Sequence, residues 1–195
     1  MPKLGMEPIR RSALIKATIA EIGHAGTLEV TVSRIAKRAG MSSALAHHYF
    51  GSKESMFLAA MRHVLTLYGA EVRGALAAAD SPEGRALAVI RASFSPGSFR
   101  REVVSAWLNF YVLAQTQPQA RRLLAVYQRR TVSNLRHALR PLLAEGAHQA
   151  ACTIAALIDG AYLHAVLGKG APDGGAAARQ VEAYLTLALK NGARA

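Results

Sequence analysis

Short hydroxyl side chains, two imidazole rings and a lysine gather in one stretch near the N-terminus, between residues 31 and 53. Side chains of these types donate hydrogen bonds to phosphate oxygens and to base edges. The candidate nucleic-acid contacts are Thr31, Ser42, Ser43, Ala44, His47, His48, Tyr49 and Lys53. Their chemistry predicts binding to a polyanion, and we assign no catalytic residue here.

A second candidate site lies in the C-terminal part, which is rich in Ala and Leu and poor in aromatic residues. Trp107, Phe110 and Tyr111 recur at spacings that share one helical face, and Asp159 precedes Tyr162 by three residues. Aromatic rings with one carboxylate bind a quaternary ammonium cation, which is held by ring faces. Plain core packing gives the same spacing and stays open as an alternative, and Asp159 could instead cap a helix or pair at a dimer interface.

Helices must position both the candidate nucleic-acid contacts and the candidate cation site, because strand signals are nearly absent and apolar residues recur at helical spacing almost throughout. Thr31 is expected to cap a helix from Val32 to Ala39, and Ser42 to cap a helix that ends at Gly51. With Gly40 at the turn, residues 31–50 have the layout of a helix-turn-helix, whose second helix enters the major groove. A generic helical hairpin has the same spacing.

We predict an all-α fold of about nine helices. Residues 1–53 would form an N-terminal three-helix DNA-binding domain, and residues 54–195 a larger C-terminal ligand-binding and dimerisation domain. The last two helices, expected over 148–167 and 176–189, are apolar over wide arcs. Such arcs predict a two-fold helix bundle between the protomers of a homodimer.

The charge balance also favours nucleic acid. Lys and Arg total 24 against 12 for Asp and Glu, which gives a net charge of +12. A surplus of this size points to nucleic acid ahead of an anionic membrane. Residues 1–63 carry +5 and the remainder +7, so charge alone does not locate the DNA site. A solvated basic face that aids solubility is the alternative interpretation.

Other classes of protein find little support. The single cysteine, Cys152, allows no intrachain disulfide and no cysteine-based zinc cluster. The seven histidines form no HExxH motif, and no glycine-rich phosphate loop follows a strand, so we predict no enzyme, cofactor or metal. The N-terminus lacks the apolar core of a signal peptide, and no uninterrupted apolar run of about 18 residues occurs. A cytoplasmic protein without a membrane partner is expected.

The run from Thr31 to Phe57, T-x3-IA-x2-AGMS…HHYFGSKESMF, resembles the DNA-binding signature of the tetracycline-repressor (TetR) family. Two positions depart from the family pattern: Ala44 stands where Gly is usual, and His47 stands where Tyr is usual. The resemblance implies a homodimeric repressor that binds double-stranded operator DNA and is released by a small-molecule effector.

Three further blocks resemble choline-responsive members of this family: MPKLGMEPIRRSALIKATI, AWLNFY and ALIDGAYLH. This resemblance implies choline or a related quaternary ammonium as effector, and control of genes for glycine-betaine synthesis from choline. Three alternatives stay open. They are a TetR-type regulator of another operon, such as efflux, with a lipophilic or cationic ligand; an architectural protein that binds DNA without sequence preference; and a helical enzyme or carrier.

Overall fold

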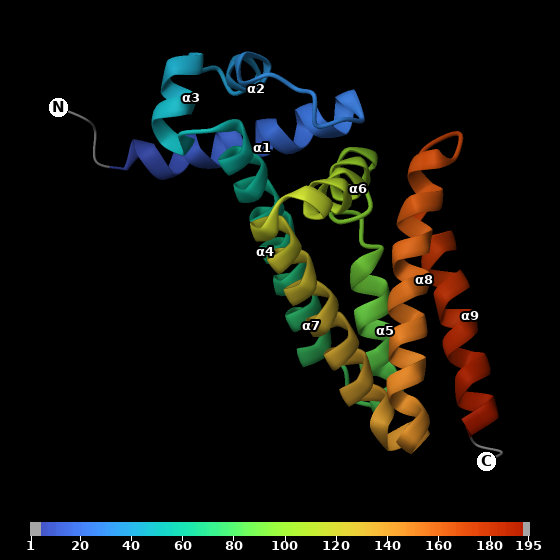
Figure 1. Cartoon of the computed structure of the whole chain (residues 1–195). Helices are drawn as coiled ribbons and strands as arrows, with labels where there is room; N and C mark the ends of the chain where they lie inside the picture. Colours follow the sequence, from blue (N-terminus) through green and yellow to red (C-terminus); the bar gives the residue numbers. More distant parts are fainter. Residues whose placement is uncertain (1–4, 193–195) are drawn as a thin grey trace. The chain divides into compact units, whose positions relative to one another are not determined.

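The computed structural model describes residues 5–192, and over that range its regular elements are all helices (Figure 1). They are α1 (Met6–Ala25), α2 (Val32–Arg38), α3 (Ser43–Phe50), α4 (Lys53–Ala77), α5 (Pro82–Ser93), α6 (Arg101–Thr116), α7 (Pro118–Leu143), the short 3-10 helix η1 (Ala144–Gly146), α8 (Ala147–Leu167) and α9 (Gly174–Gly192). The predicted all-α fold is confirmed. The first four residues of the block MPKLGMEPIRRSALIKATI lie outside the described residues.

The chain divides into two compact units. Unit 1 comprises Met1–Val64 and Glu102–Leu123, and unit 2 comprises Leu65–Arg101 and Leu124–Ala195. Both α4 and α7 run from one unit into the other. The first boundary between the two compact units therefore falls inside α4, after Val64. The boundary between a DNA-binding domain and a ligand-binding domain after residue 53 stays a prediction.

Unit 1 joins the N-terminal helices to α6. Leu14 and Ile22 of α1 are fully buried, and burial of side chains of this size contributes about 1.5–3 kcal/mol each. At Gly23, an added Cβ would lie 2.5 Å from the backbone of Glu102 at the start of α6, so only glycine permits this approach. Asn109 of α6 donates a hydrogen bond to the carbonyl of Gly26 at 3.2 Å. Helix α6 is thereby fixed to α1.

Unit 2 holds α5, α8, α9 and the remaining lengths of α4 and α7. Helices α8 and α9 contact each other and run in opposite directions (Figure 1). Ile154 and Ile158 of α8 are buried with Val181 and Leu185 of α9, so each helix places one apolar face in the core. Other faces of the two helices remain exposed, as described below.

Candidate functional site

The hydroxyls at positions 31 and 42 set where the two short helices begin. Thr31 Oγ1 accepts a hydrogen bond from the backbone N–H of Arg34 at 3.3 Å, and Ser42 Oγ accepts one from Leu45 at 3.2 Å. Each cap satisfies a backbone donor that has no partner within the helix. The predicted starts of α2 and α3 are confirmed, and both hydroxyls keep their own protons for donation.

Gly40 forms the turn between α2 and α3. Its φ of 68° is a left-handed conformation that glycine adopts without steric cost. The N–H of Met41 then donates to the carbonyl of Ala36 at 2.9 Å. Ala36 and Ala46 are buried, and small residues of this kind let the two helices approach closely. The two short helices and their turn form the predicted helix-turn-helix.

One face of α3 is turned to solvent and carries several predicted DNA contacts. Ala44, His47 and His48 lie three and four residues apart, so they share a face, and all three are exposed. Ser43 is half-exposed in the first turn. A helix that presents short and polar side chains in this way fits the major groove, where base edges offer donors and acceptors.

His47 and Tyr49 also make contacts within unit 1. Nδ1 of His47 lies 3.1 Å from the carbonyl oxygen of Gly51. Because a carbonyl oxygen only accepts, Nδ1 is the donor in this contact, and in the neutral ring Nε2 is left as an acceptor that can face a donor on a base edge. Tyr49 is half-buried: its hydroxyl accepts a hydrogen bond from Arg10 at 3.5 Å, and its carbonyl accepts one from Arg11. Tyr49 therefore ties α3 to α1, and its DNA contact stays a prediction.

Lys53 lies at the first position of α4 and joins it to the loop after α1. Its Nζ donates to the carbonyl of Leu28 at 3.3 Å and lies 5.5 Å from the centroid of the Phe57 ring. The side chain is half-exposed. Since an ammonium group has three donors, it can hold Leu28 and still donate to a phosphate.

We expect Lys53→Met to lower the slope of log K for DNA binding against log salt by about one unit per protomer, because one phosphate contact is lost. Methionine keeps an unbranched stem over Phe57 and removes the charge. Fluorescence anisotropy at several salt concentrations measures the slope. Urea unfolding measures the free energy of unfolding, which should fall by about 1 kcal/mol because the hydrogen bond to Leu28 is lost. An unchanged slope together with a lowered free energy of unfolding would show that Lys53 holds the loop at Leu28 and does not contact a phosphate.

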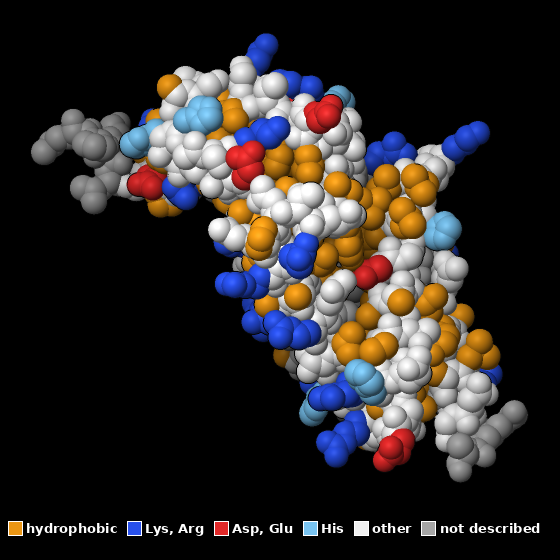
Figure 2. Space-filling view, in the orientation of Figure 1, with side chains coloured by type: hydrophobic (Ala, Val, Ile, Leu, Met, Phe, Trp, Pro, Cys, Tyr) orange, Lys and Arg blue, Asp and Glu red, His pale blue; other side chains and the backbone are white. Residues whose placement is uncertain are grey.

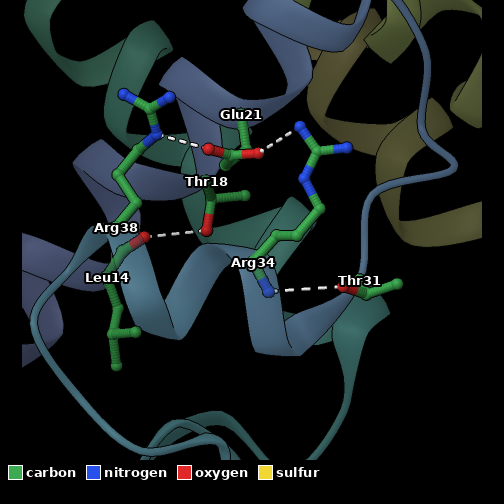
Figure 3. Close-up of polar contacts among 6 residues, drawn as sticks. All are labelled: Leu14, Thr18, Glu21, Thr31, Arg34 and Arg38. Atoms are coloured by element: carbon green, nitrogen blue, oxygen red, sulfur yellow. Dashed lines mark hydrogen bonds and ion pairs between the residues drawn. The ribbon is translucent and has the colours of Figure 1, made fainter.

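A buried carboxylate of α1 holds α2 in place. Glu21 is 5% exposed; one of its oxygens accepts a hydrogen bond from Nε of Arg38, and the other lies 3.0 Å from Nη2 of Arg34. Figure 3 shows the carboxylate between the two guanidinium groups. The two arginines are four residues apart on α2, so both can reach one carboxylate. Glu21 therefore fixes α2 against α1, and with it the start of α3.

Glu21 is ionised at neutral pH despite its burial. The hydrogen bond from Arg38 holds the pKa of Glu21 below its ordinary value, against the effect of burial, and the positive charges of Arg38 and Arg34 lower it further. Both guanidinium groups remain about half exposed. Together, Glu21, Arg34 and Arg38 carry one net positive charge beside the helix-turn-helix. This charge favours an anionic partner.

The aromatic residues singled out by their spacing on α6 do contact one another. The Trp107 ring packs edge-on against those of Phe110 and Tyr111, with ring centroids 6.4 Å and 5.7 Å apart. Trp107 and Phe110 are buried. This group lies in unit 1, which also contains the helix-turn-helix.

Tyr162 belongs to a different aromatic group, within unit 2. Its ring centroid lies 5.0 Å from that of Phe99 and 6.1 Å from that of Phe94, and its hydroxyl donates to the carbonyl of Ser93. Burial raises the pKa of Tyr162, and the negative charge of Asp159, one helical turn away, raises it further. The five predicted effector contacts are therefore divided between the two units, and their common site stays a prediction.

Tyr68 extends the group in unit 2 and was missed by sequence reasoning. Its hydroxyl lies 3.2 Å from Ser93 Oγ, and its ring centroid lies 5.4 Å from that of Tyr127. Burial raises the pKa of Tyr68, and the charge of Asp159 acts in the same direction. Tyr68 has no aromatic neighbour at helical spacing on α4, so no pattern pointed to it. In the range 5–192, no three His, Cys, Asp or Glu side chains are grouped to hold a metal ion.

Family models match both parts of the chain. Residues 14–60 match the bacterial regulatory proteins of the tetR family, and residues 82–190 match the C-terminal domain of BetI-type transcriptional repressors. The HTH-type transcriptional regulator BetI of Brucella suis is 46% identical over 190 residues, covering 97% of this chain and 96% of that protein. BetI of Rhizobium meliloti is 49% identical over 173 residues, covering 88% and 85%.

The fold is also shared with solved structures. A transcriptional regulator from Saccharomonospora viridis, crystallised in complex with choline, superimposes with a TM-score of 0.77. It covers 90% of this chain and 95% of its own, at 21% sequence identity. At that identity the likeness establishes the common fold.

Proposed function

The chain belongs to the TetR family of bacterial transcriptional regulators, with a BetI-type C-terminal domain, and from this premise we propose that it represses genes for glycine-betaine synthesis from choline. Members of the family are DNA-binding regulators that respond to a small molecule, and they are not enzymes. The observation that carries the proposal is the 46% identity to BetI over nearly the whole chain. The choline bound to the Saccharomonospora viridis regulator supports the choice of effector. We place the repressor in the cytoplasm, with its operator.

The exposed face of α3 is our candidate for reading the operator. Ala44, His47 and His48 would face the base edges, while the capping residues Thr31 and Ser42 would donate to phosphates. A dimer that presents two such helices reads half-sites about 34–36 Å apart or a multiple of that distance.

We propose that α8 and α9 pair with their copies in a second protomer. Leu163 and Leu167 of α8 are 47% and 73% exposed, and Leu187 of α9 is 59% exposed. On α8 the exposed leucines continue a line through Ala156 and Gly160 at intervals of three and four residues. A second copy of these two helices would complete a four-helix bundle and remove this apolar surface from water.

The exposed apolar face of α8 also explains an apolar window within the helical run Pro118–Leu167. This run contains an 18-residue window that is long and apolar enough to cross a membrane, and only 28% of the window is buried. One such helix is weak evidence for a membrane span. Dimerisation explains the exposed apolar window more simply than a membrane span does, because a regulator must be able to reach DNA.

We place the effector cation in unit 2, beside Asp159. Tyr68 and Tyr162 both lie close enough to this carboxylate for its charge to raise their pKa values, and the ring of Tyr127 packs on Tyr68. A carboxylate near aromatic rings suits a quaternary ammonium, because ring faces attract a cation that has no N–H to donate. The α6 group of Trp107, Phe110 and Tyr111 is the alternative location.

Calorimetry separates these two locations. We expect choline to bind, and ethanolamine to bind far more weakly, because its primary ammonium has three N–H donors and the rings offer no acceptor to those that Asp159 leaves unpaired. Asp159→Asn should weaken choline binding at least about tenfold, and loss of one ring in Tyr162→Ala should cost up to about 2 kcal/mol.

The conservative change Tyr162→Phe keeps a ring and should retain most of the affinity. Weakened binding in Trp107→Ala, with no change in Asp159→Asn, would instead move the effector to the α6 group. Equal binding of choline and ethanolamine would exclude a quaternary ammonium site.

A further inference from the structure

One hydroxyl of α7 is buried without a hydrogen-bond partner. Thr131 is 3% exposed, and its Oγ1 makes no hydrogen bond of normal geometry within residues 5–192. Other helical threonines of this chain donate to the carbonyl four residues earlier: Thr18, Thr153 and Thr186 do so at 2.8 Å, 3.0 Å and 3.1 Å. A buried hydroxyl that stays unpaired is costly, so the position of Thr131 favours a ligand that supplies the missing partner.

Thr131 lies beside Tyr68, in the aromatic group of unit 2. Tyr127 and Thr131 are four residues apart on α7, so they share one face of the helix, and the Tyr127 ring packs edge-on against that of Tyr68. Burial raises the pKa of Tyr68, and the nearby hydroxyls of Ser93 and Thr131 act against this effect. In Figure 2, Lys and Arg side chains follow one another where Figure 1 draws α4 and α7, whereas the face of α7 with Tyr127 and Thr131 is buried.

The protons of the neighbouring hydroxyls are already used in hydrogen bonds. Ser93 Oγ donates to the carbonyl of Val89 at 3.0 Å. Since a serine hydroxyl has one proton, Tyr68 must be the donor in its 3.2 Å contact with Ser93 Oγ. Tyr162 donates to the carbonyl of Ser93. Of the hydroxyls of Tyr68, Ser93, Tyr162 and Thr131, that of Thr131 is therefore the one that keeps both its proton and its lone pairs for a ligand.

We propose that Thr131 binds the hydroxyl group of the effector and makes the site selective for a quaternary ammonium that carries a hydroxyl. The inference rests on the proposed function, which places the cation beside Asp159, and deepens it by naming the residue that recognises the other end of the ligand. The phenol of Tyr68 is near both Asp159 and Thr131. A small ligand with its cation and its hydroxyl two carbons apart, as in choline, can therefore reach both residues.

Selectivity requires such a residue, because aromatic rings and a carboxylate recognise only the charge and the methyl groups of the cation. The Thr131 hydroxyl can accept the proton of the ligand's hydroxyl and donate its own to the oxygen of Tyr68. An alkyl group in the same place would leave Thr131 buried and unpaired. A site that binds a hydroxyl in this way disfavours the analogue that lacks it.

The test compares choline with propyltrimethylammonium, in which a methyl group replaces the hydroxyl, by calorimetric titration of the full-length protein. Thr131→Val removes the hydroxyl and keeps the branched shape of the side chain. Thr186→Val is the matched control, because it makes the same change at an exposed threonine of α9 in the same unit. Urea unfolding should show that Thr131→Val does not lower the free energy of unfolding, since Oγ1 of Thr131 makes no hydrogen bond within the described chain.

We expect the parent protein to bind choline about tenfold more tightly than propyltrimethylammonium, as one hydrogen bond allows. Thr131→Val should bind choline about tenfold more weakly and propyltrimethylammonium as well as the parent does, so its selectivity is lost. The control should keep the selectivity of the parent. An unchanged ratio of the two affinities in Thr131→Val, or an equal loss for both ligands, would overturn the proposal. An equal loss would make Thr131 a packing residue.

Failure of this inference is distinct from failure of the proposed function. Choline binding that depends on Asp159 and not on Thr131 would keep the effector site and refute only the recognition of the hydroxyl. A parent protein that binds neither ligand would refute both. Choline binding that is weakened in Trp107→Ala and unchanged in Asp159→Asn and Thr131→Val would move the effector to α6 and also overturn the role of Thr131.

Discussion

Replacing Leu163 and Leu167 by glutamate should turn the regulator into folded monomers that no longer hold an operator. Both leucines are exposed within one protomer, so the substitutions leave the core of unit 2 intact. In the proposed four-helix bundle the two new carboxylates would be buried without partners, at a cost of several kcal/mol. The dissociation constant of the dimer should rise at least about a hundredfold. Sedimentation velocity measures the association state.

The control is Leu67→Glu, which introduces one negative charge, against two in the test variant, at a 58% exposed leucine of α4 in the same unit. This variant should remain dimeric and bind DNA as the parent does. Leu185 is unsuitable as a probe because it is buried within the protomer, where a charge would test folding instead of association. A dimeric Leu163→Glu/Leu167→Glu variant would show that the interface lies on other helices.

Replacing Glu21 by glutamine should weaken both the fold of unit 1 and operator binding. The change removes the charge that holds Arg34 and Arg38, and the hydrogen bond that Arg38 donates to this charged group contributes about 1.5–3 kcal/mol. Because both arginines are about half exposed and can regain water, we expect a loss of about 2–3 kcal/mol in the free energy of unfolding. Operator affinity should fall as well, since α2 loses its fixed position under α3.

Glu29→Gln is the control, because it makes the same chemical change at an exposed carboxylate in unit 1. The pH dependence gives a second test. The pKa of Glu21 is lowered in the folded state, so its contribution is present above the ordinary pKa of glutamate, about 4.3, and is lost as pH falls through the lowered value. Urea unfolding should therefore show a difference between parent and Glu21→Gln at pH 7 that shrinks in acid. A difference independent of pH would contradict a role for the charge.

Local signals made the DNA-binding half of the fold predictable. Thr31 and Ser42 are strong helix-capping residues, and Gly40 is the residue expected at a left-handed turn, so the starts of α2 and α3 followed from residue type. Periodicity likewise placed Trp107 and Phe110 on one face of α6. These features depend on neighbours a few residues away, which a single sequence displays directly.

Contacts between distant segments were not predictable. Glu21 lies on α1 and its partners on α2, and nothing in the spacing along α1 marks it as the carboxylate that α2 requires. Gly23 is needed because α6 approaches its backbone, which becomes visible only when the two helices are packed. Tyr68 reaches Ser93 and Tyr127 from another helix for the same reason. Helical periodicity fixes which face a residue occupies but not which helix covers that face.

Release of operator DNA by choline is the most direct test of the central claim. A duplex carrying an operator mapped by footprinting should be retarded by the purified protein in a gel. Millimolar choline should release the duplex, and ethanolamine at the same concentration should not. Retardation that is unaffected by choline, or abolished equally by ethanolamine, would contradict the assignment of the protein as a repressor released by choline.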